Sequence, residues 1–248
     1  AQALFKSWFV DFDPVHAKTE GRAPEAMDAA TAALFPSKFE ESELGPIPKG
    51  WHAGRLGDIS TNPRDKAKPG KIDPSTPYFG LEHMPRKSIA LGDHGTAGGL
   101  GSSKFWFDES DILFGKLRPY FHKVGLAPFK GICSTDILVL RTLKPDFHAL
   151  LLTHASSDAI INYATRLSNG AKMPRSSWKD IANYPMCVPP DSVAQAFNGL
   201  IKPLFERIKE NVRESSTLSE LRDTLLPRLI SGKLRLPETT KAAEAAFG

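Results

Sequence analysis

The C-terminal part of the sequence carries the apolar pattern that most constrains the fold. From Asp191 onward, apolar side chains recur at steps of three and four residues, the spacing of one face of an α-helix. A polar interval at 213–217 interrupts the pattern, which then resumes and ends near Gly232. The pattern predicts one helix of about 40 residues. Its apolar members are Val193, Phe197, Leu200, Leu204, Ile208, Val212, Leu218, Leu221, Leu225 and Leu229.

Such a helix, rising ~1.5 Å per residue, is roughly 55–60 Å long and exceeds the width of a small domain. Its apolar stripe must therefore be buried on a partner helix or along its own domain. The pair Ser192 and Gln195 has the spacing of a capping box at the start of the helix. We expect a kink near Pro203 and an end around Pro227.

Residues 49–190 alternate short apolar runs with turn signals, which predicts strands. The segment 146–167 has helical periodicity, and a second short helix is expected to start near Ser176–Ser177. This mixture predicts an α+β fold class, with one globular mixed α/β domain followed by a long C-terminal helix of coiled-coil type. The expected strands are 78–81, 105–107, 111–115, 120–126 and 136–141.

The N-terminal residues precede this domain. Residues 1–12 are expected to form the last turns of an apolar helix that Pro14 stops. The segment 35–51 is rich in proline and glycine, which predicts a linker that ends at a buried Trp51. The tail 236–248 is expected to be disordered.

The charge is distributed unevenly along the chain. The net charge is −4 over residues 1–48, +7 over 49–190 and +1 over 191–248, which gives +4 for the whole chain. The positive excess in the middle block points to a polyanionic partner.

Motifs for catalysis and cofactor binding do not fit. The glycine cluster 92–104 lacks the P-loop spacing, and no S-adenosylmethionine motif is apparent. The histidines are scattered, Cys133 and Cys187 fit no metal spacing, and we expect both thiols to be buried and reduced. No apolar run is long enough for a transmembrane helix, and no signal peptide is visible.

Two cationic loops are the best candidates for a binding role. Residues 168–181 join hydroxyls and cations at a helix N-terminus, a combination that suits phosphate oxygens and base edges. Residues 62–71 form the second loop. We therefore select seven candidate DNA-binding residues: Arg64, Lys66, Lys116, Lys172, Arg175, Ser176 and Lys179.

Six motifs in order resemble the specificity subunits of type I restriction–modification systems. These motifs are "LFKSWFVDFDPVHAK", "ELGPIPKGW", "DILFGKLRPYFHKV", "STDILVLR", "NGAKMPRSSWKDI" and "ELRDTLLPRLISGKL". The resemblance covers about residues 3–236. It implies the C-terminal half of such a subunit, with 1–17 as the tail of a central conserved helical region, 18–48 as a linker, 49–190 as a target recognition domain and 191–235 as a distal helix that spaces half-sites and docks the methyltransferase.

The family implies a non-catalytic recognition subunit. Its partners would be double-stranded DNA, methyltransferase subunits and a restriction motor–nuclease subunit, with self-association through the long helix as a further possibility and no membrane. The family also implies that S-adenosylmethionine, ATP and Mg bind the partner subunits and that no cofactor binds this chain. It further implies that the complex acts in a bacterial or archaeal cytoplasm. Two alternatives stay open from the residues: a helical assembly module without DNA readout, and a stand-alone nuclease or methyltransferase domain.

Overall fold

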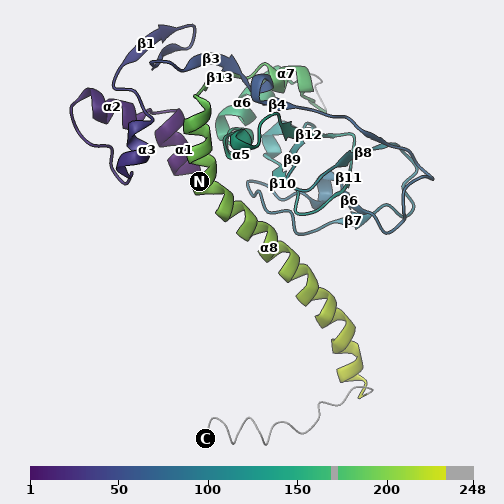
Figure 1. Cartoon of the computed structure of the whole chain (residues 1–248). Coiled ribbons are helices and arrows are strands. Elements are labelled where there is room, and N and C mark those ends of the chain that lie inside the picture. Colours follow the sequence, from purple (N-terminus) through teal and green to yellow (C-terminus); the bar gives the residue numbers. More distant parts are fainter. Residues whose placement is uncertain (169–172, 233–248) are drawn as a thin grey trace, which may run out of the picture.

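The protein is described by a computed structural model that covers residues 1–168 and 173–232. Figure 1 shows a globular body of strands and short helices, from which one long helix, α8 (Asp191–Ile230), extends. The predicted α+β organisation with a long C-terminal helix is confirmed. The tail expected to be disordered, 236–248, lies outside the described residues. No helix within the described residues is both long and apolar enough to cross a membrane.

A four-stranded sheet forms the centre of the body. Its strands, in spatial order, are β10 (Val124–Leu126), β9 (Ile112–Gly115), β12 (Ile137–Thr142) and β4 (Ser60–Thr61). On β9, Phe114 faces the core beneath the helices, whereas Leu113 faces a second core on the opposite side. Because β9 and β12 are buried on both faces, their sequences read as continuous apolar runs rather than alternating patterns.

A five-stranded sheet covers one face of the central sheet. Its order is β5 (Lys66–Ala67), β8 (Lys104–Phe107), β11 (Gly131–Cys133), β6 (Pro77–Phe79) and β7 (Gly95–Thr96). Phe79, Phe107 and Cys133 pack with Leu113 and Val139 of the central sheet in the second core. The short 3-10 helix η1 (Leu81–His83) follows β6.

Helices cover the other face of the central sheet. They include η3 (Pro145–Phe147), α5 (His148–Ala155), α6 (Asp158–Leu167) and the first half of α8. The segment 146–167, expected as one helix, is divided because the Ser157 hydroxyl accepts a hydrogen bond from the Ile160 amide and caps a new helix. The short helix expected near Ser176–Ser177 is confirmed as α7 (Trp178–Ala182).

The N-terminal residues pack into the same core as the body. They form α1 (Gln2–Phe9), α2 (Asp13–Thr19), α3 (Ala29–Ala33), a hairpin of β1 (Phe39–Ser42) and β2 (Gly45–Pro48), β3 (His52–Arg55), which pairs with β13 (Pro185–Val188), and α4 (Leu56–Ile59). Pro14 lies in the first turn of α2 and does not stop a helix there, because first-turn amides need no helical partner. The segment 35–51, expected as a linker, contains the hairpin, and Trp51 is buried as predicted.

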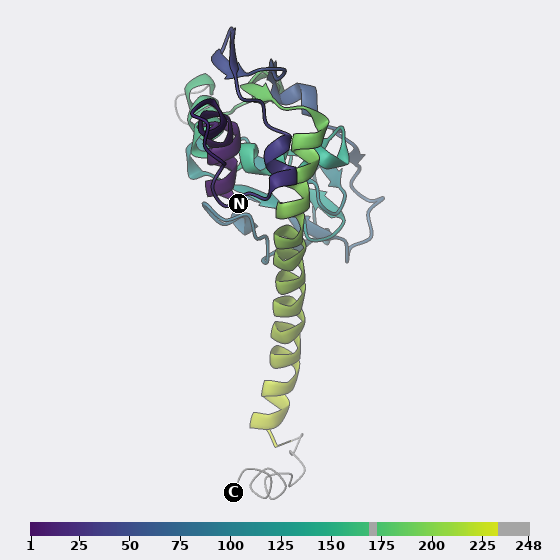
Figure 2. The ribbon, with the colours of Figure 1, turned by 60° about the vertical axis from the view of Figure 1, so that its left-hand side comes forward.

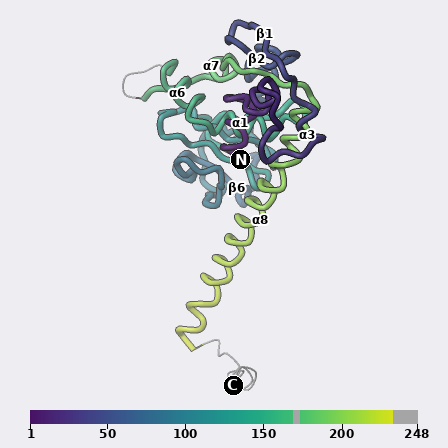
Figure 3. The backbone as a smooth tube through the Cα atoms, turned by 90° about the vertical axis from the view of Figure 1, so that its left-hand side faces the viewer, coloured from purple at the N-terminus to yellow at the C-terminus, as the bar shows by residue number. Residues whose placement is uncertain are grey.

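The long helix packs through its first half only. Val193 and Phe197 of the predicted stripe are buried, as are Ile201 and Phe205, which the stripe did not include. Leu200 and Leu204 of the stripe are about half exposed. The helix starts at Asp191 without the expected Ser192 cap and continues past Pro227 to Ile230, because one proline removes a single backbone donor. Figures 2 and 3 show the second half projecting away from the body. Its exposed apolar side chains are Leu218, Leu221, Leu225, Leu226 and Ile230.

Candidate nucleic-acid interface

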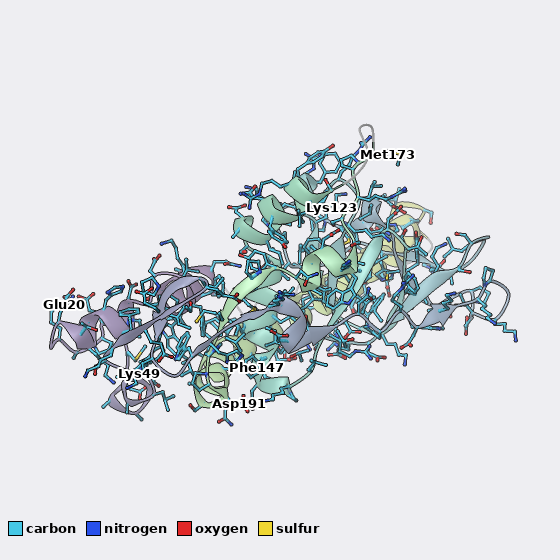
Figure 4. The ribbon with its side chains drawn as sticks, turned by 90° about the horizontal axis from the view of Figure 1, so that it is seen from above. Glu20, Lys49, Lys123, Phe147, Met173 and Asp191 are labelled. Atoms are coloured by element: carbon cyan, nitrogen blue, oxygen red, sulfur yellow. The ribbon has the colours of Figure 1, made fainter. Side chains whose placement is uncertain are left out.

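The candidate interface lies at one end of the central sheet. β9 ends at Gly115, directly opposite Ile137, where the antiparallel β12 begins, and β10 begins at Val124 beside Phe114. The segments that follow β9 and precede β10 and β12 therefore meet at this end. Figure 4 shows Lys123 and Met173 on one side of the body and Phe147 and Asp191, near the start of α8, on the other.

Two loops that are distant in sequence are hydrogen-bonded to one another here. The Ser176 amide donates to the Lys116 carbonyl at 3.0 Å, and the Arg118 amide donates to the Pro174 carbonyl at 2.8 Å. Between these bonds, Leu117 and Arg175 form an antiparallel bridge. The segments 116–118 and 174–176, which contain the selected residues Lys116, Arg175 and Ser176, thus form one structural unit.

This unit gathers positive charge around a single carboxylate. The Arg175 Nε lies 3.3 Å from the Asp136 Oδ1, and the Lys116 amide donates to the Asp136 carbonyl at 3.0 Å. Partial burial lowers the pKa of Lys116; Asp136 opposes this effect, and the nearby Arg175 and Arg64 add to it. Lys116 and Arg175 therefore share the neighbourhood of Asp136, and Arg64 lies close enough to Lys116 to influence its pKa. Such a group of cations attracts an anionic ligand.

Arg64 and Lys66 approach from the edge of the five-stranded sheet. The Arg64 guanidinium lies 5.7 Å from the centroid of the Phe105 ring, and its backbone has a positive φ of 51°. Lys66 pairs with Phe105 in β5, and both cations are exposed. An edge strand with exposed cations can reach phosphate oxygens without distorting the sheet.

The remaining selected residues divide into different environments. Ser176 is only 3% exposed, and its hydroxyl donates to the Lys116 carbonyl at 3.4 Å, so it is directed into the pairing of the two loops rather than toward solvent. Lys179 is exposed in the first turn of α7, which Ser177 caps by accepting from the Asp180 amide at 3.2 Å. Lys172 lies outside the described residues.

The sequence selection missed a second group of cations beside Lys116. The Arg86 guanidinium stacks 4.1 Å from the centroid of the Phe121 ring, and Lys123 donates to the Leu81 carbonyl. Burial, and then Arg86, lower the pKa of Lys123, while Glu82 opposes them. The basic pair Arg86–Lys87 was the sequence signal for this group, although only the fold brings it to the same end of the sheet as Lys116.

An exposed aromatic side chain stands in the same area. The 3-10 helix η2 (Pro119–Phe121) carries Tyr120, which is 51% exposed. Arg118 and His122, on either side of η2, both adopt the left-handed conformation, with φ of 50° and 52°. This conformation is uncommon for residues other than glycine, and here it occurs on both sides of η2.

The residues that the structure describes include neither a metal-binding cluster nor an exposed thiol. Within residues 1–168 and 173–232, no cluster of three or more histidine, cysteine or acidic side chains could hold a metal ion. Cys133 and Cys187 are free and buried, as predicted, and burial raises the pKa of each thiol to about 12. Thiols with such pKa values are poor nucleophiles near neutral pH.

Comparison with known proteins gives a consistent result. No family model matches the chain. It is similar to the type I restriction enzyme MjaIX specificity subunit of Methanocaldococcus jannaschii, with 27% identity over 251 residues that cover 96% of this chain and 53% of the relative. It is also similar to the EcoDI specificity subunit of Escherichia coli, with 25% identity over 217 residues that cover 82% of this chain and 48% of the relative.

A solved structure shares the fold. It comes from work on complex assembly and conformational transition of the type I R-M system, and matches with a TM-score of 0.51 and 23% identity over 77% of this chain and 51% of that chain. The resemblance found in the sequence motifs is thereby confirmed: the curated relatives of this chain are type I specificity subunits. The chain spans about half the length of the two curated relatives described above.

Proposed function

We propose that this chain is a DNA-recognition subunit of a type I restriction–modification complex and reads one half of a bipartite target. The observation that carries the proposal is the pairing of segments 116–118 and 174–176, which concentrates Lys116 and Arg175 at an exposed end of the sheet in a chain whose curated relatives are specificity subunits. Residues 49–190 would form the recognition domain, 1–17 and 191–235 the conserved helical regions, and 18–48 the connection between them.

Binding would combine two kinds of contact. Lys116, Arg175, Arg64, Lys66 and Lys179 would neutralise phosphates and orient the body on the duplex, which makes the affinity depend on salt. Polar side chains on the adjoining loops would then contact base edges in the major groove, each bidentate contact adding ~1–3 kcal/mol of discrimination.

Chemistry would reside in the partners. The methyltransferase subunits, which dock on the helical regions, would hold S-adenosylmethionine, and a motor–nuclease subunit would hold ATP and Mg. In this assembly the chain would position the complex on its DNA target and would not itself catalyse the reaction. The complex would act in the cytoplasm, where the DNA is found. Since the chain matches about half of its relatives, a second copy, another subunit or a further part of the same protein would cover the exposed leucines of α8 and supply the other half-site.

A salt series tests the proposal against both alternatives. The full chain, alone and with its methyltransferase partner, is titrated onto duplex DNA at increasing salt. We expect log K to fall linearly with log salt, with a slope of about four to five if each of the five cations named above neutralises one phosphate. An absence of binding in both preparations would leave only the assembly module, while cleavage or methylation by the purified chain alone would indicate an enzyme.

A further inference from the structure

The turn between β8 and β9 contacts α8 through a group of ion pairs. The Glu109 carboxylate lies 2.9 Å from the Lys209 Nζ and 2.8 Å from the Arg213 guanidinium. Lys209 also lies 2.8 Å from Glu206 and donates to the Ser110 hydroxyl at 2.9 Å. Its side chain is only 4% exposed, so its charge depends on these partners.

The turn itself is fixed on the central sheet. Arg141 of β12 donates to Asp111 at 2.8 Å and to Asp108 at 2.7 Å, so the residues on either side of Glu109 are tied to a buried strand. Arg213 additionally donates to the Pro128 carbonyl at 3.1 Å, at the end of the turn that follows β10. Ion pairs and hydrogen bonds are directional, unlike the apolar contacts of Phe197 and Phe205, and therefore oppose rotation of the helix.

These contacts lie where α8 leaves the body. In the part of the chain that the structure describes, α8 makes no hydrogen bond or ion pair with the body beyond Arg213. Figures 1 and 2 show the following turns extending away from it. From Arg213 to Ile230 the helix is roughly 25 Å long at ~1.5 Å per residue, so a tilt of about 10° at Arg213 would move its end by about 4 Å. This displacement is close to the ~3.4 Å rise of one base pair.

We propose that Glu109, Lys209 and Arg213 set the angle between the body and α8, and thereby the separation of half-sites that the assembled complex accepts. The inference rests on the proposed function, because it takes α8 as the spacer between two recognition domains. The three residues are positioning residues: Glu109 precedes the start of β9 and is contacted there by Lys209 and Arg213 of α8, whereas the candidate interface lies beyond the end of β9. Their loss should therefore change the spacing preference without changing the half-site that is read.

The angle can be measured without DNA. Spin labels are placed in the full chain at two exposed positions, Arg166→Cys on α6 and Ser219→Cys on α8, and the distance distribution between them is recorded. We expect a narrow distribution that broadens in the double variant Glu109→Gln, Arg213→Gln. The control is Lys144→Gln, which breaks an exposed ion pair of 2.7 Å to Asp191 at the start of α8 and should leave the distribution narrow.

The spacing preference is then measured with the complete methyltransferase complex on targets whose spacer is lengthened or shortened by one base pair. The wild-type and Lys144→Gln complexes should prefer one spacing by about tenfold or more, and the double variant should lose most of that preference while keeping the same half-site sequences. An unchanged distance distribution, or a broadened one with an unchanged spacing preference, would overturn the inference. Failure of every complex to methylate DNA would instead count against the proposed function, because the distance measurement does not depend on it.

Discussion

The amide of Ser176 donates a hydrogen bond of 3.0 Å to the carbonyl of Lys116, a residue 60 positions earlier in the chain. The hydroxyl of Ser176 is buried against the same carbonyl. These two hydrogen bonds join the loops of the candidate interface. They also distinguish Ser176, which holds the loops together, from neighbouring side chains that can reach a ligand.

Ser176→Ala should leave DNA affinity within about twofold, because the amide bond is kept and the hydroxyl bond, worth about 1 kcal/mol, contributes to folding rather than to contact. The check is DNA titration together with urea unfolding of the same variant. A loss of affinity of tenfold or more with unchanged stability would show that the hydroxyl contacts DNA and that its assignment as a positioning group is wrong.

Lys116→Ala and Arg175→Ala should each weaken binding to all duplexes alike and reduce the salt slope by about one, since each side chain is expected to neutralise one phosphate. Lys49→Ala is the matched control, an exposed lysine at the opposite end of the body from Lys123 (Figure 4). If Lys49→Ala lowers the slope as much as the other two, binding is a property of the overall charge and not of this surface.

Phe197→Ala should destabilise the fold by about 3–5 kcal/mol, because its buried ring packs against Phe9 and Trp8 with centroid distances of 4.9 and 5.7 Å. Leu204→Ala, on the half-exposed face, should change the free energy of unfolding by about 0.5 kcal/mol or less. Urea unfolding of both variants measures the difference. Equal losses would mean that both faces of α8 are packed in solution, as expected if a second copy covers Leu204.

The stability of the fold should fall between about pH 6.5 and pH 3. Burial lowers the pKa of His154 to about 3, so over this range the unfolded chain binds a proton that the folded chain does not. The free energy of unfolding should therefore decrease by up to about 1.4 kcal/mol for each unit by which the pH is lowered. Burial also lowers the pKa of His148, which adds to the same trend.

His154→Phe isolates the first contribution. The ring of His154 lies against Phe5 and Tyr184, so an aromatic replacement suits its surroundings. Urea unfolding at pH 7 and pH 5 should show a smaller decrease in stability for the variant than for the wild type. The same decrease in both proteins would mean that His154 is not buried in its neutral form.

The sequence predicted the helices and strands that leave a direct apolar pattern in the local sequence. The apolar runs of β9 and β12 and the periodicity of α8 identified these elements, because burial on both faces and helical spacing leave direct patterns. The sequence could not show that Ile201 and Phe205 are buried while Leu200 and Leu204 are half exposed, since all four are apolar and the packing of α8 against α5 and η3 decides between them. The pairing of Lys116 with Ser176 was likewise invisible, because it depends on a backbone bond between distant loops.

The sequence likewise identified only some of the cations at the candidate interface. Arg175 and Lys116 were selected from local charge, and the fold brings them together around Asp136. Arg86 and Lys123 were not selected, since a basic side chain in a loop has the same appearance whether it faces solvent or a ligand. Lys123 reaches this end of the sheet because β10, which directly follows it, pairs with β9.

The most direct test of the central claim is a map of methylated adenines in DNA from cells that express the complete system with this chain, without it, or with Lys116→Ala and Arg175→Ala combined. We predict one bipartite motif with the wild-type chain, no methylation of that motif without it, and strongly reduced methylation with the double variant. The motif should be palindromic if two copies of the chain assemble, and asymmetric if the chain is one part of a subunit with two recognition domains. Methylation of the same motif in the absence of the chain would contradict the account.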